Sequence, residues 1–68
     1  MYKFHIFSDN LICAGEIAKK LETYKFSYSF TVYERNNEIL IKFTIQVDML
    51  NSIEDTQILE DIRLKYGL

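Results

Sequence analysis

Apolar and polar residues alternate along residues 26–47, on both sides of a short turn at Asn36 and Asn37. The apolar positions share one parity before the turn and the other parity after it: Phe26, Tyr28, Phe30, Val32, Ile39, Ile41, Phe43, Ile45 and Val47. Strict alternation is typical of a strand with one buried face. The pattern therefore predicts a β-hairpin with all of these side chains in the core.

The turn also predicts the register of the hairpin. A two-residue type I′ turn needs positive φ at both central positions, which Asn tolerates. Such a turn places Phe30 opposite Phe43, and large apolar side chains then meet along the whole face. A three-residue loop would shift the pairing by one and set Phe30 opposite a polar side chain, which cross-strand packing disfavours. We therefore expect the two-residue turn.

The segment before the hairpin predicts a strand followed by a helix. Residues 2–7 alternate in the manner of a strand, and Ser8 and Asp9 are good N-cap residues for a helix that runs to about residue 24. Apolar residues recur along this helix at helical spacing and form its expected core stripe: Leu11, Ala14, Ile17, Ala18, Leu21 and Tyr24. Ile12 falls outside the stripe, so it is either exposed or covered by a partner.

A second helix is expected after the hairpin, starting at Asn51 or Ser52. Each of these residues has an acid three positions later, a spacing that resembles a capping box. The apolar stripe of the helix consists of Ile58, Leu59, Ile62 and Tyr66. Leu64 points away from that stripe and should be exposed.

The element order β-α-β-β-α predicts an α+β fold in a single domain of residues 1–68. Both helices can cover the apolar face of a three-stranded antiparallel sheet, which gives a two-layer sandwich. A right-handed crossover that skips one position sets the strand order 1-3-2. This arrangement resembles a ferredoxin-like fold that lacks its last strand. The first strand is then an unprotected edge, where a second copy could pair to form a homodimer.

Composition narrows the class of protein. The chain has 68 residues, of which 49% are hydrophobic and 15% aromatic, so disorder is not expected. No apolar run approaches the roughly 20 residues of a membrane span. The lone Cys13 has no partner for an internal disulfide, which fits a reducing cytoplasm. We therefore expect a small cytoplasmic domain with no membrane association.

The chemistry-bearing residues do not form a catalytic constellation. His5 and Cys13 lack the spaced partners that a zinc site needs, and the two glycines are too far apart for a phosphate-binding loop. A thiol-dependent enzyme using Cys13 near a helix N-terminus is the remaining catalytic hypothesis. We expect a protein that is not an enzyme and has neither a metal nor a cofactor.

Charge suggests two other functions. From Asp48 onward there are five acids and two bases, which predicts an acidic C-terminal helix that could mimic nucleic acid. The element order with an acidic terminal helix also resembles the DinI-like regulators, whose acidic helix acts on a recombinase filament; no site residue is transferred from them. A weak single-strand binder using Lys3, Tyr33 and Lys42 is the other alternative. Nucleic acid binding is not favoured, because the net charge is −2.

The favoured hypothesis is a small intracellular protein-binding module that modulates or inhibits a larger partner, of the inhibitor or antitoxin type encoded by phages and mobile elements. Three surfaces are available for it: the edge of the first strand, the open face of the hairpin, and the acidic helix. The candidate protein-binding residues on these surfaces are Lys3, His5, Tyr33, Leu40, Glu54, Asp55, Glu60, Asp61 and Leu64.

Overall fold

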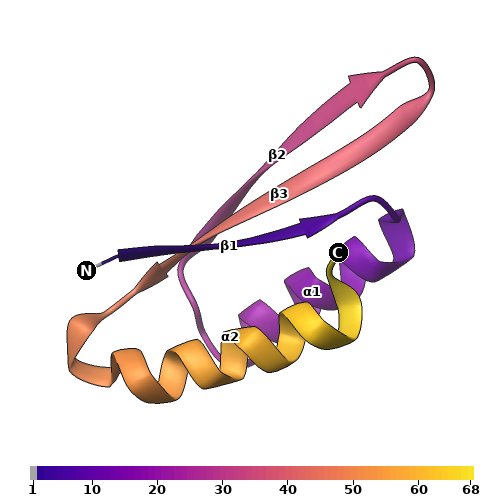
Figure 1. Cartoon of the computed structure of the whole chain (residues 1–68). Coiled ribbons are helices and arrows are strands. Elements are labelled where there is room, and N and C mark those ends of the chain that lie inside the picture. The colour runs from indigo at the N-terminus through magenta and orange to yellow at the C-terminus, as the bar shows by residue number, and fades with distance from the viewer. Residues whose placement is uncertain (1) are drawn as a thin grey trace.

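The computed structural model describes residues 2–68 and has the expected element order (Figure 1). Its elements are β1 (Tyr2–Ser8), α1 (Leu11–Thr23), β2 (Tyr28–Arg35), β3 (Glu38–Val47), a short 3₁₀ turn η1 (Met49–Asn51) and α2 (Ser52–Tyr66). The strands form one antiparallel sheet in the order β1-β3-β2. Both helices lie on the same side of this sheet. The predicted α+β fold is therefore confirmed.

The hairpin has the predicted turn and register. Asn36 and Asn37 have φ values of 51° and 67°, as the central residues of a type I′ turn require. Phe30 pairs with Phe43, and their ring centroids lie 5.8 Å apart. The twist of a type I′ turn matches the twist of the flanking strands, so this turn holds the long hairpin in one register.

Helix α1 begins later than the sequence predicts. The Asn10 side chain accepts hydrogen bonds from the backbone N–H groups of Ile12 (2.8 Å) and Cys13 (3.1 Å), so Asn10 is the N-cap. Ser8 still belongs to β1, and its buried hydroxyl donates to the Asn10 carbonyl at 3.0 Å. The prediction of Ser8 or Asp9 as N-cap is therefore wrong by one or two residues, because the strand continues through Ser8.

Helix α2 starts at Ser52, but the expected capping box is absent. The Asp48 carboxylate accepts from the Leu50 N–H at 3.0 Å and caps the turn η1, which leads directly into α2. Asn51, at the N-cap position of α2, makes no side-chain capping hydrogen bond. The first turn of the helix is thus prepared by the preceding 3₁₀ turn, and a box is not needed.

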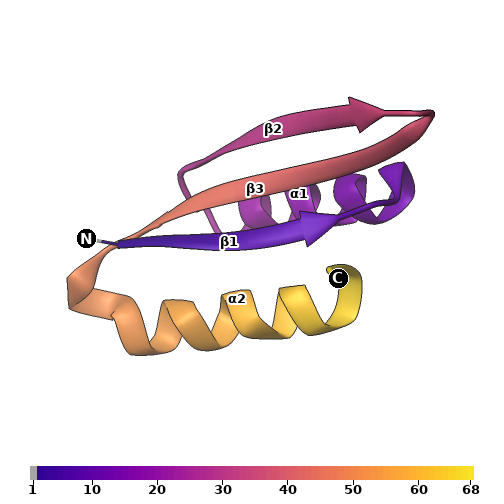
Figure 2. The same cartoon turned by 45° about the horizontal axis from the view of Figure 1, so that its top comes forward.

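The core lies between the two helices and the strands β1 and β3 (Figure 2). Helix α1 packs against β1 and α2, and α2 packs against β1, β3 and α1. The buried apolar residues are Ile6, Ala14, Ile17, Leu21, Ile41, Phe43, Ile45, Val47, Leu59 and Ile62. The apolar stripe predicted for α2 is therefore confirmed, with Ile58 and Tyr66 half-buried at its edge.

Strand β2 does not belong to this core, contrary to the prediction from its alternation. Phe30 is 58% exposed and Val32 is 50% exposed, whereas Phe26 and Tyr28 are half-buried. The parity of these side chains is as expected, since each shares a face with its buried partner on β3. The helix layer covers β1 and β3 and leaves the helix-side face of β2 open to solvent.

The ends of the α1 stripe are also more exposed than predicted. Leu11 is 66% exposed and Tyr24 is 52% exposed, so the stripe buries only its middle. The first turn of α1 lies below the part of the hairpin that diverges from the helices (Figure 1). Leu11 consequently stays largely exposed at the start of the helix.

The edge of β1 is partly protected by the end of α2. The Leu68 N–H donates to the Phe7 carbonyl at 2.8 Å, and the Gly67 N–H donates to the Arg63 carbonyl. This contact corrects the expectation of a fully unprotected first strand. The segment after α2 occupies the start of the position that a further strand would take beside β1.

Candidate protein-binding site

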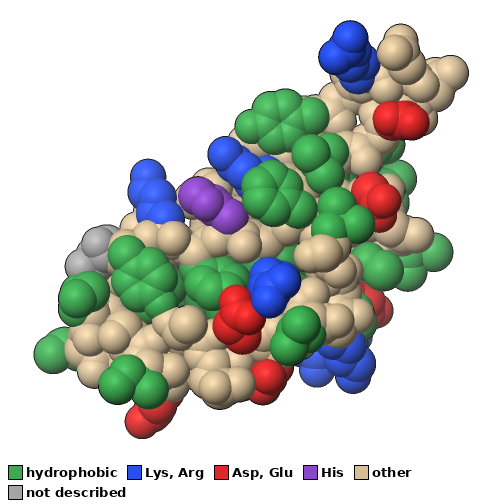
Figure 3. All heavy atoms as spheres, in the orientation of Figure 1, with side chains coloured by type: hydrophobic (Ala, Val, Ile, Leu, Met, Phe, Trp, Pro, Cys, Tyr) green, Lys and Arg blue, Asp and Glu red, His purple; other side chains and the backbone are tan. Residues whose placement is uncertain are grey.

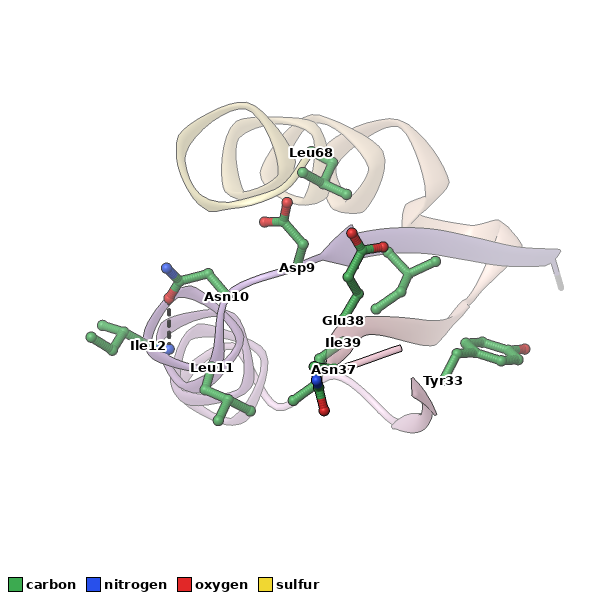
Figure 4. Close-up of a pocket in the computed structure, with 10 residues that line it drawn as sticks. Asp9, Asn10, Leu11, Ile12, Tyr33, Asn37, Glu38, Ile39 and Leu68 are labelled. Atoms are coloured by element: carbon green, nitrogen blue, oxygen red, sulfur yellow. Dashed lines mark hydrogen bonds between the residues drawn. The ribbon is translucent and has the colours of Figure 1, made fainter. Parts of the chain in front are cut away.

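Strand β1 ends while the hairpin continues, and the difference leaves a hollow in the protein surface. Ser8, the last residue of β1, pairs with Ile41, whereas β3 begins at Glu38. The hollow has a volume of about 980 Å³ and opens beside this unpaired part of β3 (Figure 4). We call it the notch, and its lining consists of Asp9, Asn10, Leu11, Ile12, Tyr33, Asn37, Glu38, Ile39, Leu40 and Leu68.

The backbone of Ile39 faces the notch. In an antiparallel sheet, the N–H and C=O groups of successive residues point alternately to the two neighbouring strands. The Gln46 N–H donates to the Ser27 carbonyl at 2.9 Å, so even-numbered residues of β3 face the β2 side. Odd-numbered residues therefore face β1, and at Ile39 β1 has already ended. The notch thus offers one strand residue with free backbone hydrogen-bonding groups.

Apolar side chains line two sides of the notch. Leu11 (66% exposed) projects from the first turn of α1, and Leu68 lies on the opposite side, whereas the neighbouring Ile12 side chain points away from the hairpin (Figure 4). Ile39 is half-buried between Leu11 and Leu68 on the hairpin. Exposed apolar residues that surround a hollow are typical of a binding site, whereas isolated ones are ordinary surface features.

Two carboxylates lie beside these apolar side chains. Asp9 and Glu38 both project at the notch in Figure 4, and both are exposed. Neither forms an ion pair with another residue in the described range 2–68. Arg35 lies opposite Glu38 in the hairpin but forms no ion pair with it. The notch therefore combines apolar contact area with two unpaired carboxylates, which favours a ligand that carries an apolar group next to a cation.

The structure brings together only two of the residues predicted for a site. Tyr33 and Leu40 are cross-strand partners and both line the notch, with Tyr33 at its outer rim and 48% exposed. Lys3 and His5 are exposed on β1, where they pair with β3 residues remote from the notch. Lys3 and His5 therefore lie several residues further along the sheet than the Tyr33–Leu40 pair.

The acidic residues of α2 do not form one continuous face. Glu54 and Asp61 are seven residues apart and share a side of the helix, whereas Asp55 is half-buried. Glu60 makes a bidentate ion pair with Arg63, whose guanidinium lowers the pKa of the Glu60 carboxyl through hydrogen bonds. Asp61 accepts from the Gln57 amide at 3.3 Å. The acids thus point in several directions.

Other exposed apolar residues were not singled out from the sequence. Met49, Leu50 and Ile53 are 62%, 89% and 87% exposed, and hydrophobic side chains reach the surface at the corner between η1 and α2 (Figure 3). Leu64 is 71% exposed on α2, as predicted. Met49, Leu50 and Ile53 could have been found in the sequence, because they are large apolar residues that lie outside the apolar stripe of α2. The hollow that Met49, Leu50 and Ile53 line is smaller than the notch, with a volume of about 280 Å³.

No metal-binding cluster occurs in the described part of the chain. Cys13 is half-buried near the start of α1, and His5 is an exposed strand residue. Neither helix within residues 2–68 has the length and apolar character needed to cross a membrane. Comparisons with known protein families, with curated proteins and with solved structures find no match to the chain.

Proposed function

We propose that this chain is a small protein-binding module that modulates a larger partner, and that the notch accepts an apolar side chain of that partner next to a Lys or Arg. The observation that carries the proposal is the composition of the notch, in which exposed Leu11 and half-buried Ile39 lie with the exposed carboxylates of Asp9 and Glu38, neither of which forms an ion pair within residues 2–68. An inhibitor or antitoxin is the functional type that we favour.

The backbone at the notch supports an extended ligand. A peptide that enters beside Ile39 continues the line of β1 and can bond to the free N–H and C=O groups of β3. Only a short segment fits, because β1 ends opposite Ile41 and β3 begins only three residues before it, at Glu38. Affinity then depends mainly on the apolar anchor, as it commonly does in protein interfaces.

The charges at the notch select the sequence next to the anchor. Asp9 and Glu38 attract Lys or Arg and disfavour acidic segments, so a basic flank increases both the association rate and specificity. Lysine and arginine side chains also have apolar stems, which can lie along Leu11 while the charged group reaches a carboxylate. The ligand class is therefore a short basic segment with one large apolar residue.

Two other functions have less support. A nucleic-acid mimic needs carboxylates arranged along one surface, and those of α2 point in several directions, with Glu60 occupied by Arg63. A single-strand binder needs stacking platforms with basic residues around them. On the open face of the sheet, Tyr33 lies next to Leu40, and the charges nearest to it along the chain, Glu34 and Arg35, have opposite signs.

The test compares capture of a partner by three forms of the protein. Wild-type protein, Leu11→Lys and Leu64→Lys are immobilised and exposed to lysate from the source organism, with salt varied between low and moderate concentration. Leu11 and Leu64 are both strongly exposed helix residues (66% and 71%), so neither substitution should affect folding. We expect a protein that the wild type and Leu64→Lys retain and that Leu11→Lys loses, and we expect salt to weaken its binding.

The captured protein is then titrated calorimetrically with the wild type and with Glu38→Lys. Charge reversal beside a basic ligand should weaken binding at least about tenfold at low salt, and by less at high salt. Equal retention by Leu11→Lys, or insensitivity to Glu38→Lys, would exclude the notch as the site. Binding of a labelled single-stranded oligonucleotide with loss in Tyr33→Ala would support the nucleic-acid alternative instead.

A further inference from the structure

Strand β2 has a completely open edge. In the sheet order β1-β3-β2 it has β3 on one side and, within residues 2–68, no strand on the other. The carbonyl of Ser27 accepts from β3, so odd-numbered residues of this segment face inward. By alternation, the N–H and C=O groups directed away from the sheet belong to Tyr28, Phe30, Val32 and Glu34.

The open edge lacks the usual protection of an edge strand. Exposed edges are normally blunted by charged residues, by proline, by bulges or by a covering segment. Residues 26–33 contain no charged residue and no proline, and the register with β3 is continuous from Tyr28 to Arg35. Strand β1 differs, because it carries Lys3 and its outer edge is contacted by Leu68 at Phe7. An unprotected, apolar edge of this length is typical of a strand that pairs with another chain.

We propose that a second copy of this chain pairs with β2, so that two antiparallel β2 strands join the two sheets into one six-stranded sheet. Two-fold pairing places the same strand on both sides of the interface, and the uncharged residues 28–33 of β2 can meet themselves without opposing like charges. The aromatic and β-branched residues of β2 are also those that favour cross-strand packing. This interface shares Tyr33 with the outer rim of the notch but uses none of the side chains that carry the partner-binding proposal, and it goes beyond that proposal.

The backbone selects one register for the pair. Only residues with outward-directed groups can bond across the two-fold axis, so an even-numbered residue must face an even-numbered residue. Centring the pair on Thr31 sets Phe30 against Val32 of the second copy and Tyr28 against Glu34 of the second copy. All the outward groups of the strand are then bonded. Moving the centre to residue 30 or 32 leaves some of them without a partner.

The same register buries the side chains that the helix layer leaves uncovered. Even-numbered residues share the helix-side face, so both helix layers lie on the same side of the joined sheet. Phe30 (58% exposed) then packs against Val32 (50% exposed) of the second copy, twice across the axis. Each Glu34 faces the uncharged Tyr28 of the second copy, so the two Glu34 carboxylates do not oppose each other. The dimer thereby covers part of the apolar surface that makes β2 unusual in the monomer.

Molar mass in solution provides the first test. Sedimentation equilibrium of the wild type should give a concentration-dependent mass between 8.1 kDa and twice that value. Phe30→Lys places like charges near the two-fold axis and should weaken dimerisation at least about tenfold. Leu64→Lys introduces the same charge on α2, away from the interface, and should leave the dimerisation constant unchanged. A wild type that remains monomeric at millimolar concentration overturns the proposal, as does unchanged dimerisation of Phe30→Lys.

Disulfide trapping tests the register. Thr31 would face its own copy as a non-hydrogen-bonded pair, with Cα atoms about 4.5 Å apart, a distance that a disulfide can span. In a Cys13→Ser background, Thr31→Cys should form a covalent dimer quickly under mild oxidation. Ser29→Cys, two residues away on the same face, should form it far more slowly. His5→Cys tests β1, and faster dimerisation there than at Thr31 would overturn the proposal. Loss of dimerisation would not affect binding at the notch, so the two proposals can fail separately.

Discussion

The Tyr28 hydroxyl donates a hydrogen bond to the Glu22 carboxylate at 3.0 Å, and this bond ties the start of β2 to the last turn of α1. The pKa of Tyr28 is raised, first by partial burial of the ring and then by the hydrogen bond and the negative charge of Glu22. Because β2 lies outside the main core, this contact is one of its few links to the helix layer.

Tyr28→Phe should therefore lower the stability of the protein in a pH-dependent way. The raised pKa means that the stabilisation is fully present below the ordinary tyrosine pKa of about 10, and is lost as pH rises through the higher value in the folded state. At pH 8 we expect a loss of about 0.5 kcal/mol, since the bond is exposed to solvent. Urea unfolding of both proteins between pH 8 and 11.5 measures the difference, which should shrink above pH 10. A difference that stays constant across this range would contradict the assignment.

The two paired phenylalanines should differ in their contribution to stability. Phe43 is 2% exposed and touches the rings of both Tyr28 and Phe30, whereas Phe30 is 58% exposed. Phe43→Leu should cost about 1–2 kcal/mol, because it opens a cavity in the core. Phe30→Leu should cost less than about 0.5 kcal/mol at low protein concentration. Denaturant midpoints measure both changes, and equal costs would mean that a helix covers β2 in solution.

Local sequence chemistry was sufficient for the order of the elements and the register of the hairpin. Asn36 and Asn37 accept the positive φ that a type I′ turn needs, and the strict alternation around them allows only one pairing of the two strands. Strand β3 was predicted most accurately, since it is central and its alternate residues are buried. Information of this kind is carried by neighbouring residues, and it does not depend on where the helices lie.

The position of the helix layer depends on long-range packing and was not predictable in the same way. The alternation of Phe30 and Val32 is the same as that of buried strand residues, and it does not reveal whether a helix covers them. The notch was missed for a related reason, because it results from the different lengths of β1 and the hairpin. Tyr33 and Leu40 were found as an exposed pair, but Asp9, Ile12 and Glu38 come near them only through the tertiary fold.

The contact between the end of the chain and β1 depends on Gly67. This residue has an ordinary extended backbone (φ −89°, ψ 175°), so its importance is steric. A Cβ at this position would lie 2.9 Å from the Arg63 carbonyl oxygen, 3.0 Å from a methyl group of Ile6 and 3.2 Å from the Phe7 carbonyl oxygen. Two of these neighbours are backbone atoms, which cannot move aside easily. Gly67→Ala should therefore displace the chain end and cost about 1–2 kcal/mol.

Gly15 provides the matched control for this prediction. It lies in the middle of α1, and a Cβ there would have no neighbour within 4 Å. Gly15→Ala should thus stabilise the protein by about 0.5–1 kcal/mol, the usual gain for Ala in a helix interior. The two substitutions are chemically the same, but their expected effects on the free energy of unfolding have opposite signs. Thermal unfolding measures both. Hydrogen exchange of the Leu68 amide, which donates to Phe7, should accelerate only in Gly67→Ala. Unchanged exchange at Leu68 would show that the chain end tolerates the methyl group and does not depend on Gly67 for its place beside β1.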